Sequence, residues 1–291
     1  MFASYFRLVR PKQWLKNIFV LLPLLFTDKK ITLSLLVDSF IIFVAFCLVS
    51  SSIYIINDII DKDEDAKHPR KKYRAIASGK IKTRQATWFG VFLFCCSMLL
   101  ATHIGLDVTF ITISYFMIML AYSFFIKRIF LCDIFCIAMG FILRVYAGAQ
   151  AIGVIVSPWL LLNTFFLSLF LGFSKRRGEL IHLADSAVMH RHVLKAYSQS
   201  ILDHMLITSS CLTLVCYALY TIENYPIVVG KSYINMFYTV PLATYGIFRY
   251  IFIVFNQKND EDIAETILTD RPLLVVSALW LLLIVLIRNS R

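Results

Sequence analysis

Three aspartates at the end of a long apolar stretch have the spacing of a cation site. Asp58, Asp61 and Asp65 stand at positions i, i+3 and i+7, so on a continuous helix they lie within about 60° of one another around the axis. Three carboxylates this close repel one another and require a compensating cation. Oxygen ligands favour Mg²⁺, which is usually shared with the phosphate oxygens of a substrate. We predict that these aspartates are catalytic and bind Mg²⁺, and the alternative is a solvated acidic helix end.

Basic residues follow the aspartates at once and predict a phosphate-binding segment. They are Lys67, Arg70, Lys71, Lys72, Arg74, Lys80 and Lys82. Lysine and arginine supply the charge-assisted hydrogen bonds that hold phosphate groups. This placement favours a site over a solvated helix end. The residues that we expect to contact substrate here are Asn57, Lys67, Arg70, Lys72 and Arg74.

A second charged cluster follows another apolar stretch and comprises Lys175, Arg176, Arg177 and Glu179. Three basic residues at a cytoplasmic helix end are most often a signal of membrane topology. Alternatively, the basic side chains bind phosphate and Glu179 ligates a second Mg²⁺. The sequence leaves both interpretations open, with Asp185 as a weaker ligand candidate.

Three further polar residues lie in or beside apolar stretches. Tyr122 and Lys127 mark the cytoplasmic end of one stretch, where such residues are either ordinary interface anchors or phosphate contacts. Arg144 lies well inside the next stretch, where a charge costs at least about 2.5–3.5 kcal/mol unless it faces the bundle interior or water. We expect Arg144 to point inwards, either to a lipid phosphate or to backbone carbonyls of the bundle.

The composition excludes an ordinary soluble domain, because 59% of the residues are apolar and only 16% are charged. We predict an all-α, polytopic membrane protein with one domain of residues 1–291. About nine transmembrane helices would surround a central cavity open to the cytoplasmic side. The net charge of +11 does not indicate nucleic acid, since the basic residues form no stripe on a soluble module.

Apolar stretches of helical length recur along the whole chain. They cover approximately residues 15–28, 35–56, 86–104, 108–126, 131–152, 158–174, 200–222, 233–255 and 273–288. With a cytoplasmic N-terminus, 22 of the 29 lysines and arginines fall on the cytoplasmic side and five on the other. We therefore expect the site to face the cytoplasm.

Several segments carry a family resemblance. The segment from Asn57 to Gly79 resembles the first aspartate-rich motif of the UbiA superfamily of intramembrane prenyltransferases. Four others resemble one branch, the polyprenyl-phosphate phosphoribosyltransferases of the decaprenyl-phosphate type: RPKQWLKN at 10–17, GFILRVYAGA at 140–149, SPW at 157–159 and KRRGEL at 175–180. The resemblance covers residues 7–275 approximately and implies substrate-binding roles for Lys16 and Asn17.

This branch implies Mg²⁺-dependent transfer of phosphoribosyl from 5-phosphoribosyl 1-diphosphate to a polyprenyl phosphate. The resemblance also implies that Tyr122 and Lys127 contact phosphate. Aromatic prenyltransferases of the superfamily carry a second DxxxD-type motif, where this chain has only Glu179 and Asp185. This departure favours the phosphoribosyl branch over prenyl transfer to an aromatic acceptor. A third, weaker hypothesis is a transporter of an anionic solute with Arg144 in its pathway.

Overall fold

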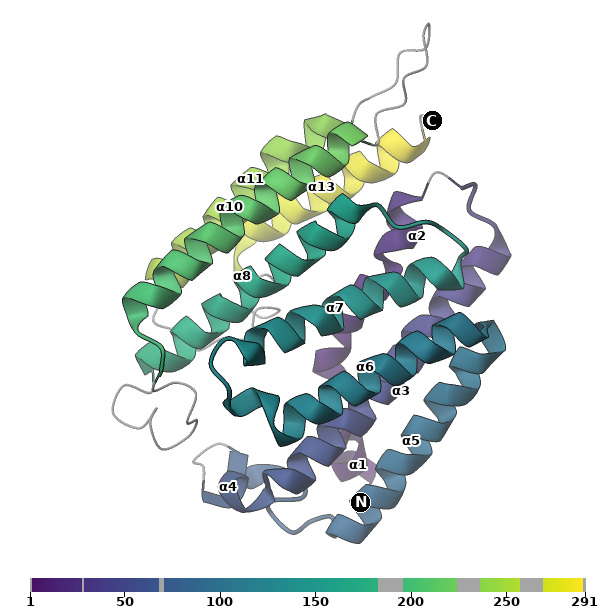
Figure 1. The fold of residues 1–291 in the computed structure, drawn as a ribbon, viewed down its shortest axis with the longest axis vertical. Coiled ribbons are helices and arrows are strands. Elements are labelled where there is room, and N and C mark those ends of the chain that lie inside the picture. The colour runs from purple at the N-terminus through teal and green to yellow at the C-terminus, as the bar shows by residue number, and fades with distance from the viewer. Residues whose placement is uncertain are drawn as a thin grey trace, which may run out of the picture. The chain divides into compact units, whose positions relative to one another are not determined.

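The computed structural model describes residues 2–27, 29–67, 71–182, 196–223, 236–256 and 269–289. Every regular element in these ranges is a helix (Figure 1). The chain divides into two compact units, residues 1–155 and 156–291, and each is described by itself. This division does not test the prediction of a single domain.

The first unit is built on four long helices and several short ones. They are α1 (Phe2–Leu8), the 3₁₀ helix η1 (Pro11–Leu21), α2 (Leu22–Phe26), α3 (Leu33–Ile60), α4 (Lys62–Lys67), η2 (Lys71–Tyr73), α5 (Thr83–Ile104), α6 (Leu106–Phe124), η3 (Ile126–Arg128) and α7 (Cys132–Ala151). Helix α3 packs against α5 and α6, and α6 packs against α7. Helix α3 begins where the Thr32 hydroxyl accepts a hydrogen bond from the Leu35 amide.

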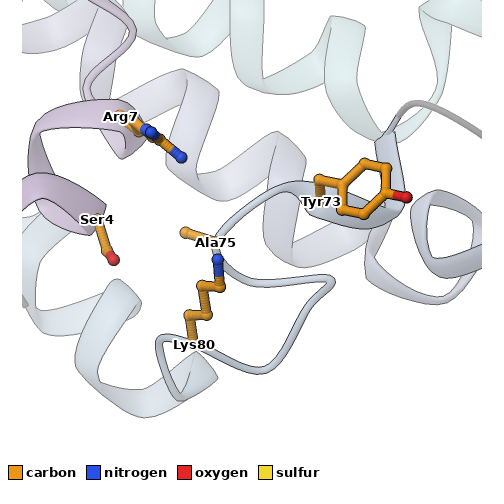
Figure 2. A pocket seen from close by; sticks show the side chains of 5 residues that line it. All are labelled: Ser4, Arg7, Tyr73, Ala75 and Lys80. Atoms are coloured by element: carbon orange, nitrogen blue, oxygen red, sulfur yellow. The ribbon is translucent and has the colours of Figure 1, made fainter.

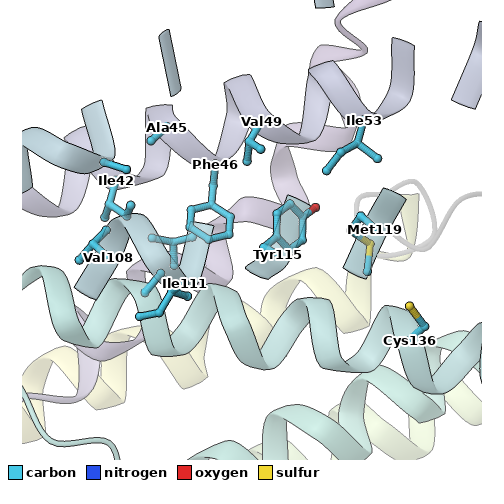
Figure 3. Packing of buried hydrophobic residues seen from close by; sticks show 13 residues of the cluster. Ile42, Ala45, Phe46, Val49, Ile53, Val108, Ile111, Tyr115, Met119 and Cys136 are labelled. Atoms are coloured by element: carbon cyan, nitrogen blue, oxygen red, sulfur yellow. The ribbon is translucent and has the colours of Figure 1, made fainter. Parts of the chain in front are cut away.

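The apolar core of the first unit centres on Phe46 of α3. The Phe46 ring is fully buried and meets Tyr115 of α6, with 5.2 Å between ring centroids. Ile42, Val49 and other residues of α3 and α6 belong to the cluster (Figure 3), and η1, α5 and α7 also contribute to it. Such close packing stabilises the contacts of α3 with its neighbours through van der Waals attraction, so the core fixes α3 and the charged residues at its end.

The described residues of the second unit form four long helices and one short one. They are α8 (Pro158–His182), α10 (Gln199–Glu223), the 3₁₀ helix η5 (Met236–Thr239), α11 (Val240–Asn256) and α13 (Arg271–Asn289). Helix α8 lies along α10, and α11 lies along α13. Helix α8 runs past residue 174, where the apolar stretch was expected to end, so the second charged cluster is part of this helix.

Seven helical segments among the described residues are long and apolar enough to cross a membrane. Six of them match a predicted apolar stretch to within a few residues at each end, and α3 is longer by a turn at its C-terminal end. The stretch at 15–28 is different, because it forms η1 and the short α2 instead of one long α-helix. The chain is thus an integral membrane protein, while nine spans and a central cavity stay predictions.

Candidate active site

The sequence suggested one continuous helix through the three aspartates, but the structure shows a break in it. Helix α3 ends at Ile60 and α4 begins at Lys62, with Asp61 at the junction. The helical hydrogen bonds nevertheless continue across it: the Asp61 amide donates to the Asn57 carbonyl at 2.9 Å, and the Asp65 amide to the Asp61 carbonyl at 2.8 Å. The junction therefore keeps the aspartates close to the helical spacing that the pattern predicted.

Asp58 and Asp65 share one arginine. The Arg74 Nη1 atom donates to Asp58 Oδ1 at 3.0 Å and to Asp65 Oδ2 at 2.6 Å. Asp58 also accepts a hydrogen bond from Arg10 Nη2. Both aspartate side chains are only 5% exposed, and buried carboxylates at this depth require such charged partners. A single cationic nitrogen thus already occupies the point on which two carboxylates converge.

Asp61 is directed to a different cation. Lys127, from the short η3, donates to Asp61 Oδ1 at 2.6 Å and to Asn57 Oδ1 at 3.3 Å. The Asn57 amide in turn donates to Asp61 Oδ2 at 3.0 Å. Lys127 therefore does not act only as an interface anchor, because it brings η3 against the acidic end of α3.

Arg10 was not among the predicted site residues, although the structure places it on Asp58. It has a left-handed backbone conformation, with φ 51° and ψ 62°, which is uncommon for residues other than glycine. Its guanidinium also lies over the Tyr54 ring, 5.1 Å from the centroid. The available signal was its position at the head of the RPKQWLKN segment, directly before Pro11.

The segment after Arg10 is tied to α3 by side-chain hydrogen bonds. Trp14 Nε1 donates to Ser51 Oγ at 3.1 Å, and the Ser51 hydroxyl lies 2.9 Å from the Val9 carbonyl oxygen. The Asn17 amide, fully buried, donates to Ser50 Oγ at 3.2 Å. These bonds hold η1 along α3 and thereby place Arg10 next to Asp58.

A glycine permits close packing on the other side of η1. A Cβ atom at Gly148 of α7 would lie 1.8 Å from the Val20 carbonyl oxygen. Only a residue without a side chain allows this approach. Gly148 therefore helps to determine where η1 lies between α3 and α7.

Arg144 lies inwards, as predicted, and is bound by uncharged partners. It donates from Nε to Asn17 Oδ1 at 2.8 Å, from Nη1 to the Gly140 carbonyl at 2.9 Å and from Nη2 to the Tyr115 hydroxyl at 2.6 Å. Its side chain also stacks on the Tyr115 ring, 4.6 Å from the centroid. These contacts favour the structural alternative, in which Arg144 joins η1, α6 and α7. Asn17 belongs to this buried group and not to the aspartate cluster.

The second cluster lies in the second unit and is largely engaged by protein partners. Arg176 donates to Glu179 at 2.6 Å. Arg177 donates to Asp203 of α10 at 2.5 Å and to the Val254 carbonyl of α11 at 2.8 Å. Both arginines are buried, whereas Lys175 is exposed. The contacts of Arg177 join three helices, so a structural role accounts for its burial.

The other predicted substrate contacts are more peripheral. Lys67 is exposed, and Lys72 is exposed with its ammonium 5.3 Å from the Tyr73 ring centroid. Lys16 and Tyr122 are partly buried. Arg70 and Asp185 lie outside the described residues.

The donor set suits a hard divalent cation in part. Asp58 and Asp65 offer only oxygen ligands and already hold one cationic atom between them, which fits the ligand preference of Mg²⁺. Asp61 is turned to Lys127 instead. In the part of the chain that the structure describes, no three His, Cys, Asp or Glu side chains come together as a metal site. All three aspartates are thus engaged by basic side chains, two of them by Arg74 and the third by Lys127.

Its apolar spans define the chain as a helical integral membrane protein, with a group of ion pairs at the end of α3. The sequence profile of the UbiA prenyltransferase family matches residues 18–270. The chain belongs to this family, and it is a transferase.

Two relatives are similar over nearly the whole chain. The decaprenyl-phosphate phosphoribosyltransferase of Corynebacterium glutamicum is 32% identical over 286 residues, covering 96% of this chain and 84% of that protein. The protein of the same name from Mycobacterium tuberculosis is 30% identical over 288 residues, covering 96% and 92%. Among solved structures, a UbiA homologue from Archaeoglobus fulgidus bound to DMAPP and Mg²⁺ superposes with a TM-score of 0.74 at 19% identity. It covers 99% of this chain and 100% of that one, and at this identity it shows the fold alone.

Proposed function

We propose that this protein transfers the 5-phosphoribosyl group from 5-phosphoribosyl 1-diphosphate to a polyprenyl phosphate and releases diphosphate. The observation that carries the proposal is the identity of 30–32% to two decaprenyl-phosphate phosphoribosyltransferases over 96% of the chain. The charged cluster at the end of α3 supports it, since it offers both carboxylates for a cation and cations for phosphates.

The reaction forms one bond and breaks another at C1 of the ribose. A phosphate oxygen of the lipid bonds to C1, while the bond from C1 to the diphosphate oxygen breaks and the diphosphate leaves with the electron pair. The attacking phosphate is already an anion, so no strong general base is required. The task of the protein is to position two anions and to stabilise the leaving group.

Residues of the first unit supply these functions. Asp58, Asp65 and Asp61 would hold Mg²⁺, which when bound neutralises charge on the departing diphosphate. Arg10, Arg74 and Lys127 now pair with the aspartates. In the proposed mechanism they exchange these carboxylates for substrate phosphates, with Asn57 orienting Lys127. Lys67, Arg70 and Lys72 are proposed as outer contacts on the route of the donor.

We propose further that the site faces the cytoplasm in the inner membrane of a bacterial cell. The distribution of lysine and arginine supports this orientation. Phosphoribosyl diphosphate is a soluble anion, and a site on the cytoplasmic face would meet it without a transport step. The acceptor chain would remain in the lipid while its phosphate reaches the site.

A direct assay tests the proposal against the second candidate, prenyl transfer to an aromatic acceptor, which the description of the family favours. Purified protein is given radiolabelled phosphoribosyl diphosphate and polyprenyl phosphate with Mg²⁺, and in parallel a prenyl diphosphate and 4-hydroxybenzoate. We expect labelled lipid in the first reaction alone. The Asp58→Asn protein should lose it, and the Asp63→Asn protein, changed at an exposed position, should keep it. Product in the second reaction alone would replace the proposal by its alternative.

A further inference from the structure

A pocket in the first unit carries two cations that the proposed mechanism does not use. It has a volume of about 230 Å³. It is lined by Ser4 and Arg7 of α1, by Tyr73 of η2, and by Ala75 and Lys80 of the loop between η2 and α5. Figure 2 shows Arg7 and Lys80 reaching towards Ala75 from opposite sides. We infer that this pocket is a second anion subsite, which binds a phosphate monoester.

The basic residues of the pocket differ from those at the aspartates in having no carboxylate partner among the described residues. Among the described residues, the side chains of Arg7 and Lys80 make no hydrogen bond or ion pair. Arg10 and Arg74, by contrast, are both held by carboxylates. Two cations that share a cavity and lack a carboxylate partner raise the local concentration of anions. The Ser4 hydroxyl adds a further hydrogen-bond donor at the wall.

The walls of the pocket are fixed by buried neighbours. Leu8, Ile76 and Ile81 directly adjoin Arg7, Ala75 and Lys80 and are at most 2% exposed. They belong to one apolar cluster. The loop is also closed on itself, because the Ile81 amide donates to the Ala75 carbonyl at 3.0 Å. The backbone that carries the two exposed side chains is therefore ordered before a ligand binds, so only the side chains lose conformational freedom.

The loop turns sharply where glycine is required. Gly79 has φ +73°, in the left-handed region that glycine adopts without a steric penalty. Its amide donates to the Ile76 carbonyl at 3.0 Å. This turn brings Lys80 back towards Ala75 and so completes the pocket.

The same loop reaches the active site. Arg74, which bridges Asp58 and Asp65, stands between the pocket residues Tyr73 and Ala75. The pocket and the aspartates are therefore contacted by neighbouring residues of the same segment. This inference rests on the proposed function for its choice of ligand, because the donor and the lipid acceptor both carry a phosphate monoester.

Binding of small probes without turnover tests the subsite. Ribose 5-phosphate represents the donor and dodecyl phosphate the lipid, and each is titrated into the purified protein by calorimetry. We expect one of them to bind saturably, and the Arg7→Gln/Lys80→Gln protein to bind it at least tenfold more weakly, which is about 1.4 kcal/mol. The single variants should each show part of this loss. The preferred probe identifies the source of the phosphate, and the KM of that substrate should rise by the same factor.

A matched control carries Lys12→Gln and Arg84→Gln, which remove one lysine and one arginine at exposed positions outside the pocket. It should bind the probe as the unchanged protein does. Equal loss in this control, or no loss in the pocket variant, would overturn the subsite, as would failure of both probes to bind. Because these titrations involve no reaction, a protein without phosphoribosyl transfer activity could still confirm the subsite and refute only the proposed function.

Discussion

Arg74 lies between the two carboxylates that would hold Mg²⁺ in the proposed mechanism, so its removal should strengthen metal binding. One nitrogen atom of its guanidinium bridges Asp58 and Asp65 at 3.0 and 2.6 Å. A divalent cation can bind both carboxylates only after this nitrogen has left. In the Arg74→Gln protein the competitor is absent and the repulsion between the two carboxylates is larger, and both changes favour the metal.

The size of the effect follows from the two hydrogen bonds. A hydrogen bond to a charged group contributes roughly 1.5–3 kcal/mol. Solvent weakens such bonds at a side chain that is 28% exposed, and we take about half of the sum for the pair. In the Arg74→Gln protein the metal does not have to break these two hydrogen bonds, which saves about 1.5–3 kcal/mol. The dissociation constant of the metal should therefore fall roughly ten- to hundredfold. The KM of the phosphoribosyl donor should rise in the same protein, since Arg74 is also a proposed phosphate contact.

Mn²⁺ as a paramagnetic substitute for Mg²⁺ makes the first effect measurable without substrate. The free ion is followed by electron paramagnetic resonance while it is titrated into detergent-purified protein. The Arg74→Lys protein keeps a cation and should bind Mn²⁺ more weakly than Arg74→Gln does. Asp58→Asn should bind it least of all. Unchanged or weaker Mn²⁺ binding in a folded Arg74→Gln protein would refute the view that Arg74 competes with the metal.

Three further predictions follow from the contacts described above. Replacing Asp58, Asp61 or Asp65 by Asn should each remove most turnover, whereas Asp63→Asn should keep it, and equal sensitivity at Asp63 would contradict the arrangement at the helix junction. Arg144→Met should lower the free energy of unfolding by about 1–3 kcal/mol for each buried partner left without its hydrogen bond, as measured by unfolding in detergent. Unchanged stability together with a raised KM for the lipid would instead assign Arg144 to phosphate binding. Arg177→Gln should lower the melting temperature because it loses Asp203 and Val254, while the exposed Lys175→Gln should not; a raised donor KM at normal stability in Arg177→Gln would return this residue to the substrate site.

The sequence by itself determined the properties that depend on near neighbours. Runs of apolar residues predicted the helices of both units, because a membrane requires each spanning segment to satisfy its own backbone hydrogen bonds. The spacing of Asp58, Asp61 and Asp65 predicted a helical path for this segment, and its i to i+4 hydrogen bonds continue across the junction at Asp61. The inward direction of Arg144 followed from the cost of exposing a charge to lipid.

Tertiary structure alone decided which charges meet. Arg10 and Lys127 reach the aspartates over sequence separations of 48 and 66 residues, and no local rule selects them from among the other basic residues. The contact of Arg10 depends on how η1 is held against α3 and α7, through Asn17 and the missing side chain of Gly148. The contact of Lys127 depends on where η3 lies after α6. The 3₁₀ form of η1 likewise escaped prediction, since an apolar pattern does not distinguish it from an α-helix. Arg7 and Lys80 line the same pocket because their neighbours Leu8, Ile76 and Ile81 are buried in one apolar cluster. Packing creates this cluster, and the linear order of the residues does not reveal it.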